Sequence, residues 1–161
     1  MKTIYLEIDG VKGSEKHGNL TNQIPIQNFS FGVERFVRSV PGSTKNREHS
    51  VPHVTKINLV KGSCVATPGL HSKSMFGKGV QMKIRVIENA GEANSHVSSL
   101  ITLKNATITS HQIMCNENTG MQEHMQISFT NYTMECTPVD SFGKKGTTAV
   151  VGYDIEKVKK I

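Results

Sequence analysis

Hydrophobic and polar side chains alternate along several segments of this chain, and this two-residue period is the feature that most constrains its fold. Ile4, Leu6 and Ile8 share one side of a segment at 3–9, and segment 80–86 repeats the pattern with four hydrophobic residues. Such alternation is typical of a β-strand that buries one face. We therefore expect a mainly β protein.

The same period predicts further strands, and the segments between them predict loops. The expected strands lie at 24–35, 54–61, 80–86, 96–109, 124–137 and 147–156. Segments 11–23 and 110–122 have no clear period and are expected to be loops. Within 124–137 the hydrophobic phase changes near Thr130 and Asn131, which a β-bulge would produce.

One short helix is expected after these first strands. Thr67 is a suitable N-cap and Pro68 a suitable first helical residue, because a missing N–H costs nothing there. Gly77 or Gly79 would end the helix in a left-handed cap. Its inward face would be formed by Leu70, followed by Met75 or Phe76.

About seven strands and one helix predict an antiparallel β-barrel or two-sheet sandwich. The 161 residues fit one domain, so residues 1–161 are expected to form a single unit. The N-terminus runs straight into a charged, alternating segment, which predicts no signal peptide. No stretch has the length of a membrane span, so membrane insertion is not expected.

The net charge of +6 leaves a second reading open. A basic protein can bind nucleic acid or act as an adaptor for acidic partners. The basic residues are scattered, however, and their densest group is Lys157, Lys159 and Lys160. A nucleic-acid-binding or adaptor β-barrel is therefore the alternative function.

Residues that could carry catalysis or bind a metal are sparse. His49 and His53 are four apart, as are His111 and Cys115, but neither pair lies in a predicted helix, where that spacing suits a metal. Cys64 and Cys136 lie in or beside predicted strands and are expected to be structural. We therefore predict no enzyme activity, no cofactor, no metal and no small-molecule substrate.

In their order and spacing, several segments resemble one family: Hcp, the tube protein of bacterial type VI secretion systems. The segments are Tyr5–Ser14, Ile24–Gly32, Ala66–Leu70, Val80–Val86 with Asn89–Gly91, Ser99–Thr109 and Val151–Ile155. The chain departs from the family in having Phe29 and Phe31 where Trp is frequent. Its long loop at 36–53 is also basic instead of rich in Gly or His.

The resemblance implies a two-sheet β-barrel with one flanking helix, assembled into hexameric rings that stack into a tube. The implied partners are further copies of the chain, a trimeric spike protein, a contractile sheath and effector proteins carried in the lumen. It also implies synthesis in the bacterial cytoplasm followed by secretion. Because the chain ends just after its last predicted strand, it is expected to be a plain tube subunit.

Two sets of site residues follow from this resemblance. A long loop without a core of its own is usually functional, so segment 36–53 is expected to reach a neighbouring subunit or ring. Its candidate contact residues are Phe36, Arg38, Val40, Lys45, Arg47, His49 and Val51. Ser30 has the opposite parity to Phe29 and Phe31, so it would face away from the core and is a candidate for contact with cargo in the lumen.

Overall fold

The computed structural model describes residues 2–37, 41–42, 50–89 and 95–161. Within these ranges the chain forms strands and one helix, α1 (Thr67–Phe76). The strands are β1 (Lys2–Ile8), β2 (Glu15–His17), β3 (Leu20–Ile26), β4 (Asn28–Ser30), β5 (Val33–Glu34), β6 (His53–Val54), β7 (Ile57–Gly62), β8 (Val80–Asn89), β9 (Ser95–Asn116), β10 (Gly120–Ser128), β11 (Asn131–Cys136), β12 (Ala149–Asp154) and β13 (Lys159–Lys160).

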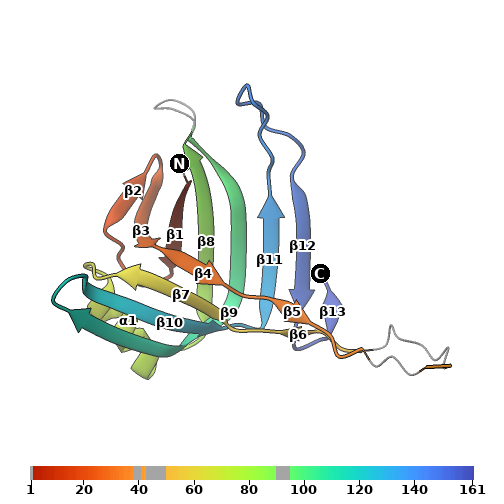
Figure 1. The fold of residues 1–161 in the computed structure, drawn as a ribbon, viewed down its shortest axis with the longest axis horizontal. Helices are drawn as coiled ribbons and strands as arrows, with labels where there is room; N and C mark the ends of the chain where they lie inside the picture. Colours follow the sequence, from red (N-terminus) through yellow and green to blue (C-terminus); the bar gives the residue numbers. More distant parts are fainter. Residues whose placement is uncertain (1, 38–40, 43–49, 90–94) are drawn as a thin grey trace.

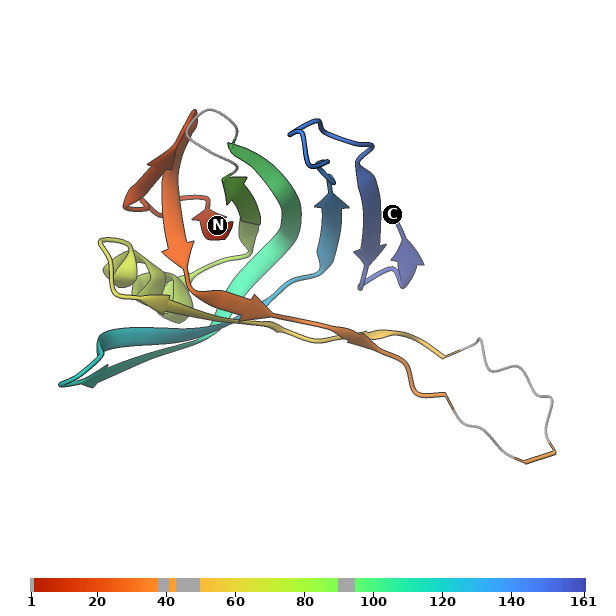
Figure 2. The ribbon, with the colours of Figure 1, turned by 45° about the horizontal axis from the view of Figure 1, so that its top comes forward.

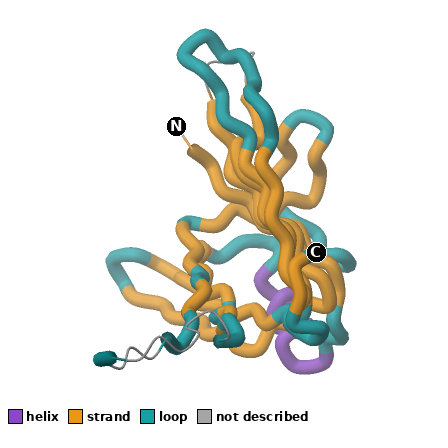
Figure 3. The backbone as a smooth tube through the Cα atoms, turned by 90° about the vertical axis from the view of Figure 1, so that its right-hand side faces the viewer, coloured by secondary structure: helices purple, strands orange, loops and turns teal. Residues whose placement is uncertain are grey.

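The strands form two antiparallel layers and a small ribbon (Figures 1 and 2). The first layer has the order β13-β12-β11-β9-β8-β1-β3-β2, and the second has the order β4-β7-β10-β9. Strands β5 and β6 pair with each other as a ribbon that leaves the body. Figure 3 shows the helix near one end of the strand layers. The predicted fold, antiparallel β with one short helix, is confirmed.

Strand β9 belongs to both layers. Its first part pairs with β11 as far as Lys104 and with β8 as far as Ala106, and its last part pairs with β10 from Thr107 onward. Next to this change of partners lies Asn105, whose φ is +50°. Asn tolerates this left-handed conformation better than most residues do, and a local irregularity bends a strand. The chain thus changes layer at Asn105.

The hydrophobic core lies between the layers and under the helix. Leu6, Ile84 and Leu103 come from the first layer, and Leu59 and Ile127 come from the second. All five are buried. Alternation therefore identified the inward faces of β1 and β8 correctly, although Val86 is only half-buried because the pairing of β8 with β9 shifts between Val86 and Ile87.

Two predicted loops are hairpins in the structure. Segment 11–23 contains β2 and the start of β3, and segment 110–122 contains the end of β9 and the start of β10. The tips of both hairpins expose both faces, so their residues need no hydrophobic alternation. The loop predictions were wrong for this reason.

Two predicted strands are divided in the structure. Segment 124–137 forms β10 and β11, which lie in different layers, so the phase change marks a crossing between layers and the predicted bulge near Thr130 is wrong. Segment 24–35 is divided among β3, β4 and β5. Val33 has the same parity as Phe29 and Phe31, which predicts an inward position, but it is exposed because it lies in the ribbon.

The helix forms where expected, but its ends differ from the prediction. Ala66 occupies the N-cap and Thr67 is the first helical residue. Gly77 ends the helix in an extended conformation, and a Cβ there would clash with the carbonyl oxygen of Lys73. Leu70 is buried, whereas Met75 and Phe76 are exposed, contrary to prediction. No helix in the described ranges is long and apolar enough to span a membrane.

A buried group of polar side chains joins the helix to the second layer. The Nζ atom of Lys61 lies 2.6 Å from Oε2 of Glu123, and both side chains are fully buried. The hydroxyl of Thr67 donates to the same oxygen at 2.7 Å, and Nε2 of His111 lies 2.6 Å from Oε1. We call these four residues the Glu123 cluster. Thr67 thus uses its hydroxyl in this cluster, while Ala66 takes the N-cap position.

The hydrogen bonds of the Glu123 cluster decide the charge of its carboxyl group. Burial raises the pKa of Glu123, but hydrogen bonds from Lys61, Thr67 and His111, together with the charge of Lys61, outweigh burial and lower it. The carboxylate is therefore the stable form, and it balances the buried ammonium group. Breaking a buried ion pair costs more than forming it contributes, because one uncompensated charge remains.

We predict that Glu123→Gln destabilises the protein by about 3–5 kcal/mol, since Lys61 stays buried without its counter-charge. The measurement is urea unfolding followed by far-ultraviolet circular dichroism. Glu88→Gln is the matched control, because Glu88 pairs with Lys2 at the surface and its loss should change stability little.

Two further results would identify the cause as uncompensated charge. The double variant Lys61→Met/Glu123→Gln should regain most of the loss, because it removes both charges. The contribution of Glu123 should be complete above its ordinary pKa of about 4.3, and should be lost as the pH falls through its lowered folded-state pKa. If Glu123→Gln were no more harmful than Glu88→Gln, the cluster would not anchor the helix.

Candidate functional site

The outer side of the second layer carries a continuous set of uncharged polar side chains. Strand pairing aligns Ser30 with Asn58, Asn58 with Gln126, and Gln126 with Ser110. A parallel row joins Asn28, Val60, His124 and Gln112. We call this surface the polar face; its polar members are Asn28, Ser30, Asn58, Ser110, Gln112, His124 and Gln126.

The polar face is hollowed, with a volume of about 340 Å³ lined by residues of all four strands. None of the described residues that line it is Asp, Glu, Lys or Arg. This contrasts with the whole chain, in which 20% of residues are charged. Contacts on this face would depend on hydrogen bonds from amides and hydroxyl groups, and little on charge.

Ser30 lies on the polar face because of the alternation in β4. Phe29 and Phe31 pack against the core, and Phe31 also meets Tyr132 edge to face with ring centroids 5.8 Å apart. Ser30 between them is exposed. The predicted outward position of this residue is confirmed, while its contact with cargo stays a prediction.

The ribbon carries two of the candidate contact residues. Phe36 follows β5 and is 83% exposed, and Val51 precedes β6 and is 63% exposed. Both line a hollow of about 300 Å³ with Arg35 and His53. Arg38, Val40, Lys45, Arg47 and His49 lie outside the described residues. Large apolar side chains so exposed are typical of a contact surface when they occur together.

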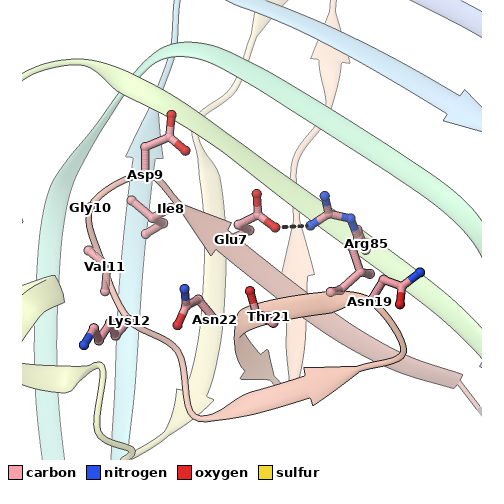
Figure 4. Close-up of a pocket in the computed structure, with 11 residues that line it drawn as sticks. Glu7, Ile8, Asp9, Gly10, Val11, Lys12, Asn19, Thr21, Asn22 and Arg85 are labelled. Atoms are coloured by element: carbon pink, nitrogen blue, oxygen red, sulfur yellow. Dashed lines mark hydrogen bonds and ion pairs between the residues drawn. The ribbon is translucent and has the colours of Figure 1, made fainter.

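A larger hollow, of about 560 Å³, lies beside the end of β1 (Figure 4). Glu7 and Arg85 meet across it at 2.8 Å, and the side chain of Gln23 bonds to both. Burial raises the pKa of Glu7, but the Gln23 hydrogen bond and the Arg85 charge outweigh it and lower the pKa. These groups satisfy one another, so they hold the β2–β3 hairpin and leave no free acid or base between them.

The candidate metal and nucleophile residues do not converge. Within the described ranges no group of three or more His, Cys, Asp or Glu side chains is placed to hold a metal. His111 belongs to the Glu123 cluster and is not paired with Cys115, which is exposed on the β9–β10 hairpin. Cys64 packs against the core, as expected of a structural cysteine. Cys136 is exposed, which does not fit the structural role expected of it.

The comparison with known families places these surfaces in context. The model of the family described as type VI secretion system effector, Hcp, matches residues 5–136 of this chain. A comparison with curated protein sequences found no significant match.

Solved structures share the fold at low sequence identity. A structure described as a type six secretion system protein has a TM-score of 0.90 and 18% identity, with 100% of each chain covered. Hcp1 from Salmonella typhimurium has a TM-score of 0.79 and 20% identity over 99% of each chain. A type VI secretion system effector from Yersinia pestis has a TM-score of 0.70 and 19% identity over 94% of this chain and 98% of the other.

The family match spans most of the chain, and the structural matches have the same arrangement of strands and helix. The chain therefore belongs to the Hcp family, the tube proteins of type VI secretion systems.

Proposed function

We propose that this protein assembles into hexameric rings that stack into a tube, and that the polar face lines the lumen and contacts effector proteins. Residues 1–161 act as one domain in this assembly. The spike protein, the sheath and the effectors of the secretion system are its further partners. The observation that carries the proposal is the joint presence of two uncovered strand edges, an exposed apolar ribbon and an uncharged polar face on a chain of the Hcp family.

The uncovered strand edges favour assembly with further copies. Among the described residues, β4 pairs only with β7, and the last part of β9 pairs only with β10. Both edges belong to the second layer and lie at its opposite sides. Unpaired edges promote contact with other chains unless they are covered. A head-to-tail arrangement of copies would cover both edges, and such contacts form a ring when the rotation closes.

The ribbon favours a second kind of contact. The ribbon leaves the body of the subunit (Figure 2). Phe36 and Val51, next to its two strands, are exposed and therefore add little to the stability of one subunit. A neighbouring subunit or ring can bury them and gain about 25 cal/mol for each Å² of apolar surface removed from water. A tube needs contacts within rings and contacts between rings. The ribbon extends away from the body and is suited to make one of these two kinds of contact.

We predict that Phe36→Asp weakens assembly without unfolding the subunit. Sedimentation velocity should show the distribution shifted from large particles towards smaller ones, because a charge would have to be buried at the contact. The melting temperature of the subunit should stay nearly constant, since Phe36 is mostly exposed. Phe36→Leu is the control and should assemble normally; equal assembly of the Asp and Leu variants would exclude Phe36 from the contact.

We also predict that Ser30→Arg reduces the retention of effector protein while rings still form. The bulky charged side chain would project into the hollow of the polar face, which is uncharged in the native protein. Co-purification of the effector with assembled rings measures retention. Ser72→Arg, at an exposed position of α1, is the control. Normal effector retention by intact Ser30→Arg rings would reject the role of the polar face in cargo contact. The proposal of ring assembly would still stand.

A further inference from the structure

Two histidines form a contact that reaches from the protein surface to the Glu123 cluster. Nδ1 of His71 on α1 lies 3.0 Å from Nδ1 of His111 on β9. The ring centroids are 5.2 Å apart, and the ring planes are inclined by 58°. At this separation the two nitrogens share one hydrogen atom, because one must donate and the other accept.

The buried neighbours of His111 decide which nitrogen donates. Glu123 is an ionised carboxylate and can only accept, so Nε2 of His111 carries a hydrogen and donates it to Oε1 at 2.6 Å. In neutral His111 the other nitrogen, Nδ1, then has a lone pair and accepts from His71. The hydrogen-bonded chain therefore runs from His71 through His111 to Glu123.

The groups around His111 disfavour a second positive charge beside that of Lys61. Lys61 on β7 approaches Glu123 on β10 at 2.6 Å and already balances its carboxylate, and Thr67 on α1 donates to the same oxygen. On β10, Met125 is paired opposite His111 and is apolar. A proton added to Nδ1 of His111 would therefore add a cation next to the balanced pair, and His71 could accept from it only with its own hydrogen on Nε2. The closed contact therefore holds one added proton in all, because a second would place two donors against each other at 3.0 Å.

We propose that the His71–His111 contact is a proton-operated latch that holds α1 against β9 near neutral pH and opens in acid. Free imidazole groups take up protons as the pH falls through about 6.5. His71 is exposed and can accept a proton on Nε2 while it still donates from Nδ1. Once one ring carries an added proton, the other ring cannot be protonated without placing a hydrogen on both Nδ1 atoms, which breaks the contact and releases the side-chain link between helix and strand.

The direction of the pH effect follows from proton counting. In the unfolded chain both imidazoles take up a proton, whereas the closed latch takes up one fewer. Stability rises with pH wherever the unfolded state binds more protons. The folded protein therefore loses stability as the pH falls below about 6.5, and this loss begins above the range in which carboxyl groups titrate.

The test compares melting temperatures at about pH 7.5 and about pH 5 in the wild type and in His71→Asn. An amide can donate to neutral His111 and, after rotation, accept from charged His111, so it tolerates both protonation states. We expect the decrease in melting temperature on acidification to be smaller in His71→Asn by about 5 °C. His124→Asn is the control, because His124 is next to Glu123 in sequence but lies on the polar face; its decrease should equal that of the wild type.

An equal decrease in the wild type and in His71→Asn would overturn the proposal. A second measurement observes the latch itself: nitrogen NMR of the imidazole rings at neutral pH should show His111 with its hydrogen on Nε2 and an accepting Nδ1. A hydrogen on Nδ1 of His111 at neutral pH would equally contradict the latch. Neither measurement depends on ring assembly or cargo, so either can fail while the proposed function stands.

Discussion

The double membership of β9 is the constraint on which the rest of this structure depends. One continuous strand pairs with β8 and β11 in the first layer and with β10 in the second, and it changes layer at Asn105. Its bend places the hydrophobic sides of both layers opposite each other, so that they enclose one core. It also gives the second layer an outer side, the polar face, and leaves the last part of β9 uncovered as an edge. The core, the polar face and the edge are thus consequences of a single bend.

The Glu123 cluster secures the helix to this frame from within. Strand pairing places Lys61 opposite Glu123, and Thr67 and His111 complete the hydrogen bonds of the carboxylate from the helix and from β9. A buried charge pair gives little net stability compared with apolar packing, but it penalises every arrangement in which a partner is missing. We infer that the cluster fixes the position of α1 more than it strengthens the fold, while the opposite side of the same strands stays free for contacts.

The sequence predicted the parts of the fold in which one face is buried and the other is solvated. β1, β7 and β8 were identified for this reason, and so was the outward position of Ser30. Hairpin tips carry no such contrast, so the pattern predicts loops at β2 and at the β9–β10 hairpin. The Glu123 cluster was missed, although a signal existed: Lys61 shares the inward parity of Ile57 and Leu59, and Glu123 that of Met125 and Ile127. Whether Phe76 is buried or exposed depends on where the helix ends relative to β9. The local sequence pattern carries no information about that position.

The central claim is that the uncovered edges and the ribbon bring copies of this chain together in closed rings. Electron microscopy of the purified protein tests this most directly, since particle averages report symmetry without a variant or a partner. Our account predicts rings with six-fold symmetry and, at high protein concentration, short stacks of them. A population of single subunits under all concentrations, combined with steeply salt-dependent binding to DNA, would contradict it and favour the alternative of a nucleic-acid-binding β-barrel.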